Sequence, residues 1–159
     1  MALSPIIRGY RLGDLDALID VFLRAIREVA CRDYTSAQID AWARVDRGTW
    51  SERRLSRPTW VAEWQGNIVG FTDLEADGHL DMMFVHPDYQ GLGIATALLC
   101  TVEQAARHQG LIRLFTEASL TARPFFERRG FVVLASQQVS HHGQVLTNFQ
   151  MERLLLPLQ

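Results

Sequence analysis

The sequence predicts an α/β (α+β) fold with a mixed, mostly antiparallel sheet of seven strands flanked by about four helices. Three observations predict this class. Some segments alternate apolar and polar residues as strands do, others repeat apolar residues at the three- and four-residue spacing of helices, and glycine-containing turns separate them. The expected order is β-α-α-β-β-β-α-β-α-β-β, in one domain spanning residues 1–159.

The first part of the chain predicts one strand and two helices. Residues 5–11 form an apolar-rich run, and Asp14 follows it as the expected N-cap of the first helix. A second, shorter helix is expected over residues 36–43. The apolar face of the first helix consists of Leu15, Leu18, Ile19, Phe22, Leu23 and Ile26.

The middle of the chain predicts three strands joined by tight turns. Residues 58–65 and 68–75 flank a Gly66-Asn67 tip, which supplies the left-handed backbone that a hairpin needs. A third strand is expected over residues 79–85. Because strand side chains alternate, His79 and Asp81 are expected to share one of its faces.

The last part of the chain predicts two helices and three strands. The helices are expected over residues 93–108 and 121–129, and each is followed by a glycine that can end it. The strands are expected over residues 111–116, 131–139 and 145–154.

The composition argues against a nucleic-acid-binding, membrane-binding, secreted or metal-binding protein. Sixteen basic and eighteen acidic residues give a net charge of −2, without the basic cluster typical of nucleic-acid or membrane-surface binding. The two cysteines form no CxxC pair, and the first residues lack a secretory signal pattern. We therefore expect a cytoplasmic protein with no nucleic-acid partner, no membrane partner and no structural metal.

A glycine-rich turn, Gln90-Gly91-Leu92-Gly93, stands between the predicted third strand of the middle region and the helix that follows. Its free backbone N–H groups and the positive end of the helix dipole favour phosphate binding. The P-loop pattern is absent, and Thr96 stands where the dinucleotide-binding fingerprint needs Gly or Ala. By itself such a GxG pair serves equally well to shape a connection.

At this point the sequence resembles the GNAT family of acetyltransferases. Gln90-x-x-Gly93-x-Ala95, preceded by Val85-x-Pro87, matches the family's pyrophosphate signature. Ala122-x-x-x-Phe126-Glu127-x-x-Gly130-Phe131 is similar to its second CoA-side helix, and Thr147-Asn148-Phe149-x-Met151 is similar to the bacterial YafP-type subgroup. The resemblance implies a GNAT fold whose central strands splay to admit acetyl-CoA, the co-substrate.

The resemblance also implies which residues hold the cofactor. A backbone N–H near Phe84 or Val85 would polarise the acetyl carbonyl, and Ser119 would contact the pantetheine arm in place of an Asn. Phe126 stands where many relatives carry the Tyr that protonates the departing thiolate. The implied CoA-binding residues are Phe84, Val85, Gln90, Gly91, Leu92, Gly93, Ile94, Ala95, Thr96, Ser119 and Phe126.

Three residues are candidates for catalysis by the same resemblance. Asp81 and His79 correspond to general-base positions, and the Tyr34 hydroxyl could replace the acid missing at Phe126. Each has a simpler alternative. Asp81 could bind the ammonium without taking its proton, His79 could be an exposed turn residue, and Tyr34 could be a packed aromatic.

The implied activity is direct transfer of an acetyl group to an amine of a small molecule or peptide. Two alternatives stay open: a non-catalytic acyl-CoA sensor, suggested by Phe126, and acetylation of a macromolecule such as charged tRNA, which the near-neutral charge disfavours. A homodimer is compatible with the sequence. The acceptor is not identified.

Overall fold

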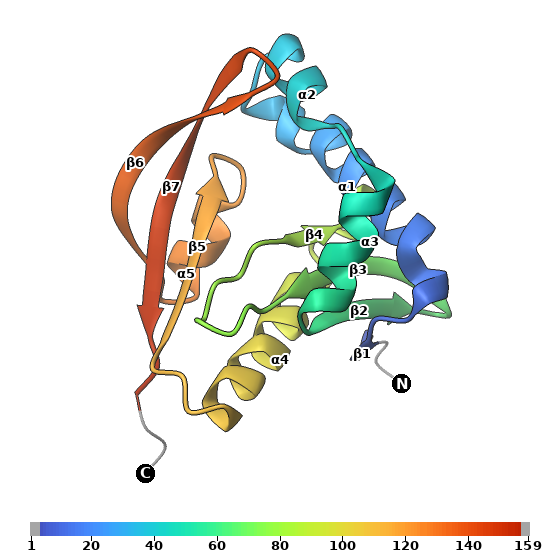
Figure 1. Cartoon of the computed structure of the whole chain (residues 1–159), viewed down its shortest axis with the longest axis vertical. Helices are drawn as coiled ribbons and strands as arrows, with labels where there is room; N and C mark the ends of the chain where they lie inside the picture. Colours follow the sequence, from blue (N-terminus) through green and yellow to red (C-terminus); the bar gives the residue numbers. More distant parts are fainter. Residues whose placement is uncertain (1–3, 157–159) are drawn as a thin grey trace.

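The computed structural model describes residues 4–156, shown in Figure 1. Within them the chain forms seven strands and five α-helices. In order these are β1 (Ile6–Gly9), α1 (Leu15–Glu28), α2 (Ser36–Trp42), α3 (Arg47–Ser56), β2 (Thr59–Trp64), β3 (Asn67–Asp73), β4 (Met83–Val85), α4 (Ile94–His108), β5 (Arg113–Ser119), α5 (Arg123–Arg128), β6 (Val132–His141) and β7 (Gln144–Leu154). No helix in this part of the chain is long and apolar enough to cross a membrane.

The strands form two antiparallel sheets. The first has the order β1-β2-β3-β4 and the second β5-β7-β6, and the two meet at one parallel bridge between His79 and Phe115. Figure 1 shows them as separate layers that diverge from this junction. The predicted α/β class with seven strands is confirmed, and the mixed character of the sheet is confined to the junction.

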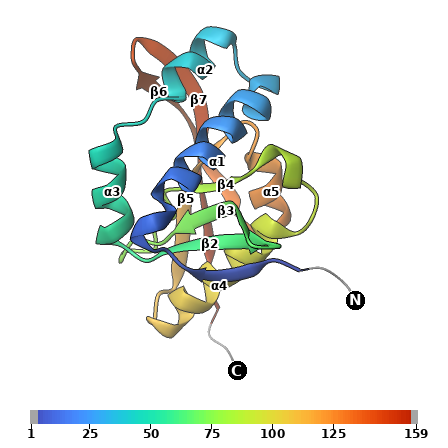
Figure 2. The same cartoon turned by 90° about the vertical axis from the view of Figure 1, so that its right-hand side faces the viewer.

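The first sheet is buried on both faces. Val61 and Phe71 pack in a cluster with α1, whereas Ala62 and Val69 pack on Ile94 and Leu98 of α4. Val61 and Ala62 alternate between the two faces as strand geometry requires, whereas Val69 and Phe71, two residues apart, are placed on opposite faces by the register shift between β2 and β3. Figure 2 shows α1 and α4 on opposite sides of this sheet. The two helices thus fix the position of β4, the strand that precedes the glycine-rich turn.

The prediction that Asp14 caps the first helix through its side chain is wrong. Its carboxylate makes no cap bond, and instead accepts Arg8 Nη1 at 2.8 Å, Arg8 Nη2 at 3.0 Å and the Arg11 N–H at 2.8 Å. The Arg8 guanidinium holds the pKa of Asp14 below its usual value. A paired donor fork outcompetes single helix amides for the same oxygens.

Helix α3 was not predicted from the sequence. It begins after Asp46, whose carboxylate accepts the Thr49 N–H at 3.0 Å. Only Trp50 and Arg54 are buried along it. An apolar-periodicity test misses such a helix because one of its two inward side chains is charged.

The strand expected over residues 79–85 is much shorter, because β4 begins at Met83. The Asp73 side chain explains the difference, because its Oδ1 accepts the Asp81 and Met82 N–H groups at 2.9 and 3.1 Å. These two groups are therefore not available for strand pairing. The hairpin between β2 and β3 also differs from the prediction, since Gln65 and Gly66 carry the positive φ angles of 50° and 83°.

Candidate active site

A cleft of about 1120 Å³ separates the two sheets. At its closed end the sheets still touch: Leu80 N–H donates to the Phe115 carbonyl at 2.8 Å, and the Thr116 hydroxyl to the Leu80 carbonyl at 2.7 Å. Beyond this point, within residues 4–156, β4 pairs only with β3 and β5 only with β7. The facing edges of β4 and β5 are therefore free to bind a ligand.

The orientation of β4 turns the backbone N–H groups of alternate residues, Met83 and Val85, toward the cleft. The His86 N–H donates to the Val69 carbonyl at 2.7 Å, in register with the pairing of Phe84 with Phe71. Because antiparallel strands alternate between hydrogen-bonded and open positions, the N–H and C=O of Val85 point away from β3. The Gln90 side chain donates to that Val85 carbonyl at 3.0 Å, in keeping with this orientation.

The glycine-rich turn closes one end of the cleft. Gly91 and Gly93 have φ angles of 75° and 80°, and α4 begins at the next residue, Ile94. The first amides of a helix have no intrahelical acceptor, so they stay available to an anion. The turn residues that line the cleft are Gln90, Gly91, Gly93, Ile94, Ala95 and Thr96. The Leu92 side chain is 45% exposed and does not line it.

Two arginines that the sequence reasoning missed lie at the end of α5, and one of them, Arg129, reaches the first turn of α4. Arg128 and Arg129 at the end of α5 line the cleft, and Arg129 Nη2 donates to the Thr96 hydroxyl at 2.5 Å. Neither makes an ion pair among the described residues. Their place in Glu127-Arg128-Arg129-Gly130 gave no signal, because only the fold brings the end of α5 to the start of α4.

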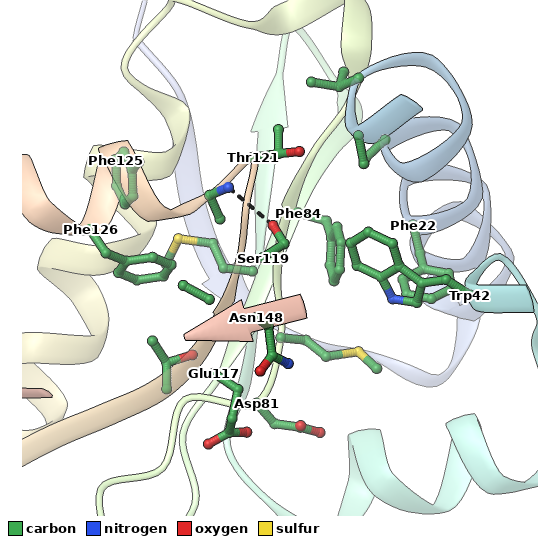
Figure 3. Close-up of a pocket in the computed structure, with 18 of the residues that line it drawn as sticks. Phe22, Trp42, Asp81, Phe84, Glu117, Ser119, Thr121, Phe125, Phe126 and Asn148 are labelled. Atoms are coloured by element: carbon green, nitrogen blue, oxygen red, sulfur yellow. Dashed lines mark hydrogen bonds between the residues drawn. The ribbon is translucent and has the colours of Figure 1, made fainter. Parts of the chain in front are cut away.

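At the opposite end of the cleft Asp81 and Glu117 lie close together, as Figure 3 shows. His79 bridges outward from them: its Nε2 is 2.8 Å from Glu117 Oε1 and its Nδ1 is 3.0 Å from Glu75 Oε2. The Glu117 carboxylate, more than any other group, raises the pKa of His79 to about 9. His79 is therefore protonated at neutral pH, and it does not line the cleft itself.

Glu117 is a site residue that the sequence reasoning did not place. The strand predicted to end at residue 116 continues to Ser119, so Glu117 lies on β5 with its side chain on the cleft face. Donor atoms of His79, Asp81 and Glu117 fall within 4.8 Å of one another, a spacing that could hold a metal ion. Both ring nitrogens of His79 already face carboxylates, so the ion pairs account for the cluster.

A buried ion pair fixes the backbone of Asp81. Arg54 Nη1 lies 3.2 Å from Asp73 Oδ2, and both side chains are fully buried. Burial raises the pKa of Asp73 and lowers that of Arg54. Since the other oxygen of Asp73 accepts the Asp81 N–H, helix α3 controls where the Asp81 carboxylate sits. Arg57 lies 3.4 Å from that carboxylate.

Known proteins that are similar to this chain agree with the geometry of the cleft. Residues 30–153 match the model of the acetyltransferase (GNAT) domain. The chain is 38% identical to the uncharacterized N-acetyltransferase YafP of Escherichia coli (strain K12), over 91% of this chain and 93% of that protein. This chain belongs to the GNAT acetyltransferase family. It is an N-acetyltransferase.

Solved GNAT structures are similar over 98% of the chain. A GCN5-related N-acetyltransferase from Rhodopseudomonas palustris, also described as a class-II aminotransferase, is 34% identical with a TM-score of 0.93, covering 98% of this chain and 99% of its own. The yncA acetyltransferase from Salmonella typhimurium, solved with acetyl-CoA, is 22% identical with a TM-score of 0.70, covering 98% and 96%. The GNAT fold predicted from the motifs is confirmed.

This sequence departs from the GNAT pattern at Ser119 and Phe126. Both side chains have structural contacts in the fold. Ser119 Oγ accepts the Ala122 N–H at 3.0 Å, so it shapes the entry to α5 (Figure 3). Phe126 is 4% exposed and packs edge-on against Phe131 at 5.1 Å. It lines the cleft as part of the core, without a group that could donate a proton.

The third catalytic candidate, Tyr34, has its hydroxyl fully engaged. It donates to the Thr147 carbonyl at 2.7 Å and accepts the Leu120 N–H at 2.9 Å. Burial raises the pKa of Tyr34. The side chain lines the cleft, yet these bonds tie the segment before α2 to β7 and to the end of β5.

Proposed function

We propose that this protein transfers the acetyl group of acetyl-CoA directly to the amine of a small molecule or peptide. The observation that carries the proposal is the splayed cleft, with an anion-binding turn at one end and two carboxylates at the other. The backbone amides of residues 91–96 would hold the pyrophosphate, with Arg128 and Arg129 adding positive charge.

The chemistry needs an oxyanion site and a proton acceptor. The Val85 N–H faces the cleft where the thioester carbonyl would lie, so it would stabilise the tetrahedral intermediate. Asp81 is proposed as the group that takes a proton from the bound ammonium, directly or through a water, so that the free amine can attack the thioester. Glu117, held by protonated His79, would position that ammonium, which makes His79 a positioning residue.

No hydroxyl occupies the Phe126 position, so departure of the thiolate would be completed by water. A thiol has an ordinary pKa near 8.5, and the thiolate is therefore a tolerable leaving group near neutral pH. The same absence favours one alternative function, an acyl-CoA-binding sensor without turnover.

Two measurements test the proposal. Titration calorimetry should detect acetyl-CoA binding, and a panel of amines should include some that release free CoA thiol at a rate above hydrolysis. Binding without amine-stimulated release would support the sensor instead, and no binding by the folded protein would refute both.

Asp81→Asn tests the assignment of the base. Turnover should fall about 100-fold, within the range for loss of a general base, while the dissociation constant of acetyl-CoA stays within about twofold. Asp40→Asn is the matched control, because Asp40 is exposed on α2 away from the cleft. Unchanged turnover in Asp81→Asn would remove Asp81 from catalysis and make Glu117 the next candidate.

A further inference from the structure

The half of the cleft that faces away from the glycine-rich turn has one aromatic wall. Phe22 of α1, Trp50 of α3 and Phe84 of β4 stack edge-on, with ring centroids 4.7 Å apart for Phe22–Trp50 and 5.0 Å for Phe22–Phe84. Trp42 of α2 completes the wall 6.3 Å from Phe84. Figure 3 shows Trp42 and Phe84 facing the open space, with Phe22 behind them. This wall suits an apolar or aromatic body.

The opposite wall is polar and belongs to the second sheet. The pairing of β5, β7 and β6 sets Glu117 beside Gln150 and Ser119 beside Asn148, which is also paired with Gln137. Their side chains share the cleft face of that sheet. Asn148 Oδ1 is buried and has no donor among the described residues.

The arginines that line this half lie apart from its carboxylates, each of which has another cationic neighbour, Arg57 for Asp81 and His79 for Glu117. The carboxylates of Asp81 and Glu117 lie at the inner end, where the two sheets part. Arg44 and Arg53 line the cleft from the α2–α3 side, are exposed, and make no ion pair within residues 4–156. Figure 2 shows α3 and α5 on opposite sides of the molecule, so these arginines are distinct from the pair at the end of α5.

Resting on the proposed function, we infer that the acceptor is an α-amino acid with an aromatic or branched apolar side chain. Its ammonium would lie between Asp81 and Glu117, its side chain against Trp42 and Phe84, and its carboxylate toward Arg44 and Arg53. A polyamine would meet the two guanidinium groups with like charge, and a sugar phosphate would leave the aromatic wall without a partner.

The test compares two acceptors on two enzymes. L-Phenylalanine and phenethylamine differ by the carboxylate alone, and the variant Arg44→Gln with Arg53→Gln removes its proposed partners. At saturating acetyl-CoA, kcat/KM for thiol release with L-phenylalanine should fall at least tenfold in the double variant, the size of one charge-assisted hydrogen bond. The value for phenethylamine should change less than twofold. Because each acceptor is compared with itself, the different basicities of the two amines cancel.

Controls separate this inference from the function on which it rests. Arg27→Gln, at an exposed arginine of α1 outside the cleft, should leave both acceptors unaffected. Equal losses for the two acceptors in the double variant, or a preference of the unmodified protein for phenethylamine, would overturn the inference while acetyl transfer stands. A protein that acetylates no amine of the wider panel would instead refute the proposed function.

Discussion

Replacing Gly78 by alanine tests whether the two sheets must approach closely to open the cleft at the right place. Gly78 has a φ angle of 96°, and a Cβ added there would lie 2.2 Å from the Arg113 carbonyl oxygen. Ordinary contact begins at 3.4 Å, so the backbone of one sheet has to move by about an ångström. The Gly78 carbonyl accepts the Phe115 N–H at 3.1 Å, and this is one of the few hydrogen bonds between the two sheets.

The expected loss has two parts. A left-handed backbone costs a non-glycine residue about 1–2 kcal/mol, and forced overlap costs about 1–3 kcal/mol more. Gly66→Ala is the matched control, because Gly66 has a φ angle of 83° with no atom within 4 Å of an added Cβ. It should lose only the first part.

Urea denaturation followed by circular dichroism would give both free energies of unfolding. Gly78→Ala should lose about 1–3 kcal/mol more than Gly66→Ala, and its affinity for acetyl-CoA should fall while that of the control holds. Equal losses in the two variants would show that the close approach of the sheets carries no energy, and the reasoning would fail.

Three further predictions concern side chains around the cleft. Tyr34→Phe should lower the free energy of unfolding by about 1–3 kcal/mol, because it leaves the Thr147 carbonyl and the Leu120 N–H without partners. Thermal denaturation measures this loss. A loss of turnover at saturating substrate would mark Tyr34 as a proton donor as well. Asp73→Asn should cost about 3–5 kcal/mol by leaving the Arg54 charge uncompensated in the interior, and adding Arg54→Met should recover part of the loss in denaturant titrations; no recovery would contradict an electrostatic cause. The folded pKa of His79, about 9, lies above its unfolded value, so its stabilisation is complete below about pH 6.5 and is lost as the pH rises through 9. The unfolding free energy should fall by about 1 kcal/mol across this window, a value reduced for the partly exposed carboxylates, and His79→Gln should abolish the fall.

Elements marked by a helical repeat of apolar residues or by a tight turn were predictable from the sequence. Four of the six residues predicted for the apolar face of α1 are buried, namely Leu15, Leu18, Phe22 and Ile26. The hairpin strands β2 and β3 were predicted within two residues of their bounds. The turn before α4 was predicted as well, because its glycines are required by positive φ angles.

Elements held by polar side chains were not predictable. Arg54, with Trp50, anchors the otherwise exposed helix α3 in the interior, and Asp73 takes the backbone bonds that would have extended β4. The site shows the same division. The glycine-rich turn is local in sequence, whereas the cleft position of Glu117 depends on where β5 ends, and those of Arg53 and Arg129 on long-range packing. No local pattern records such placements.

The unpaired edges of β4 and β5 have a consequence for how this protein avoids self-association. A free strand edge is a template on which other chains can add strands, and proteins usually protect it at the surface with charge or a bulge. Here two such edges face each other across the cleft, flanked by the other residues that line it, and their spacing is set by the bridge at Phe115. Such an enclosed edge excludes the broad sheet of a neighbouring chain and admits a single slender molecule with amides along its length. The unpaired strand edges, which promote self-association in open sheets, here limit the width of the ligand that can bind.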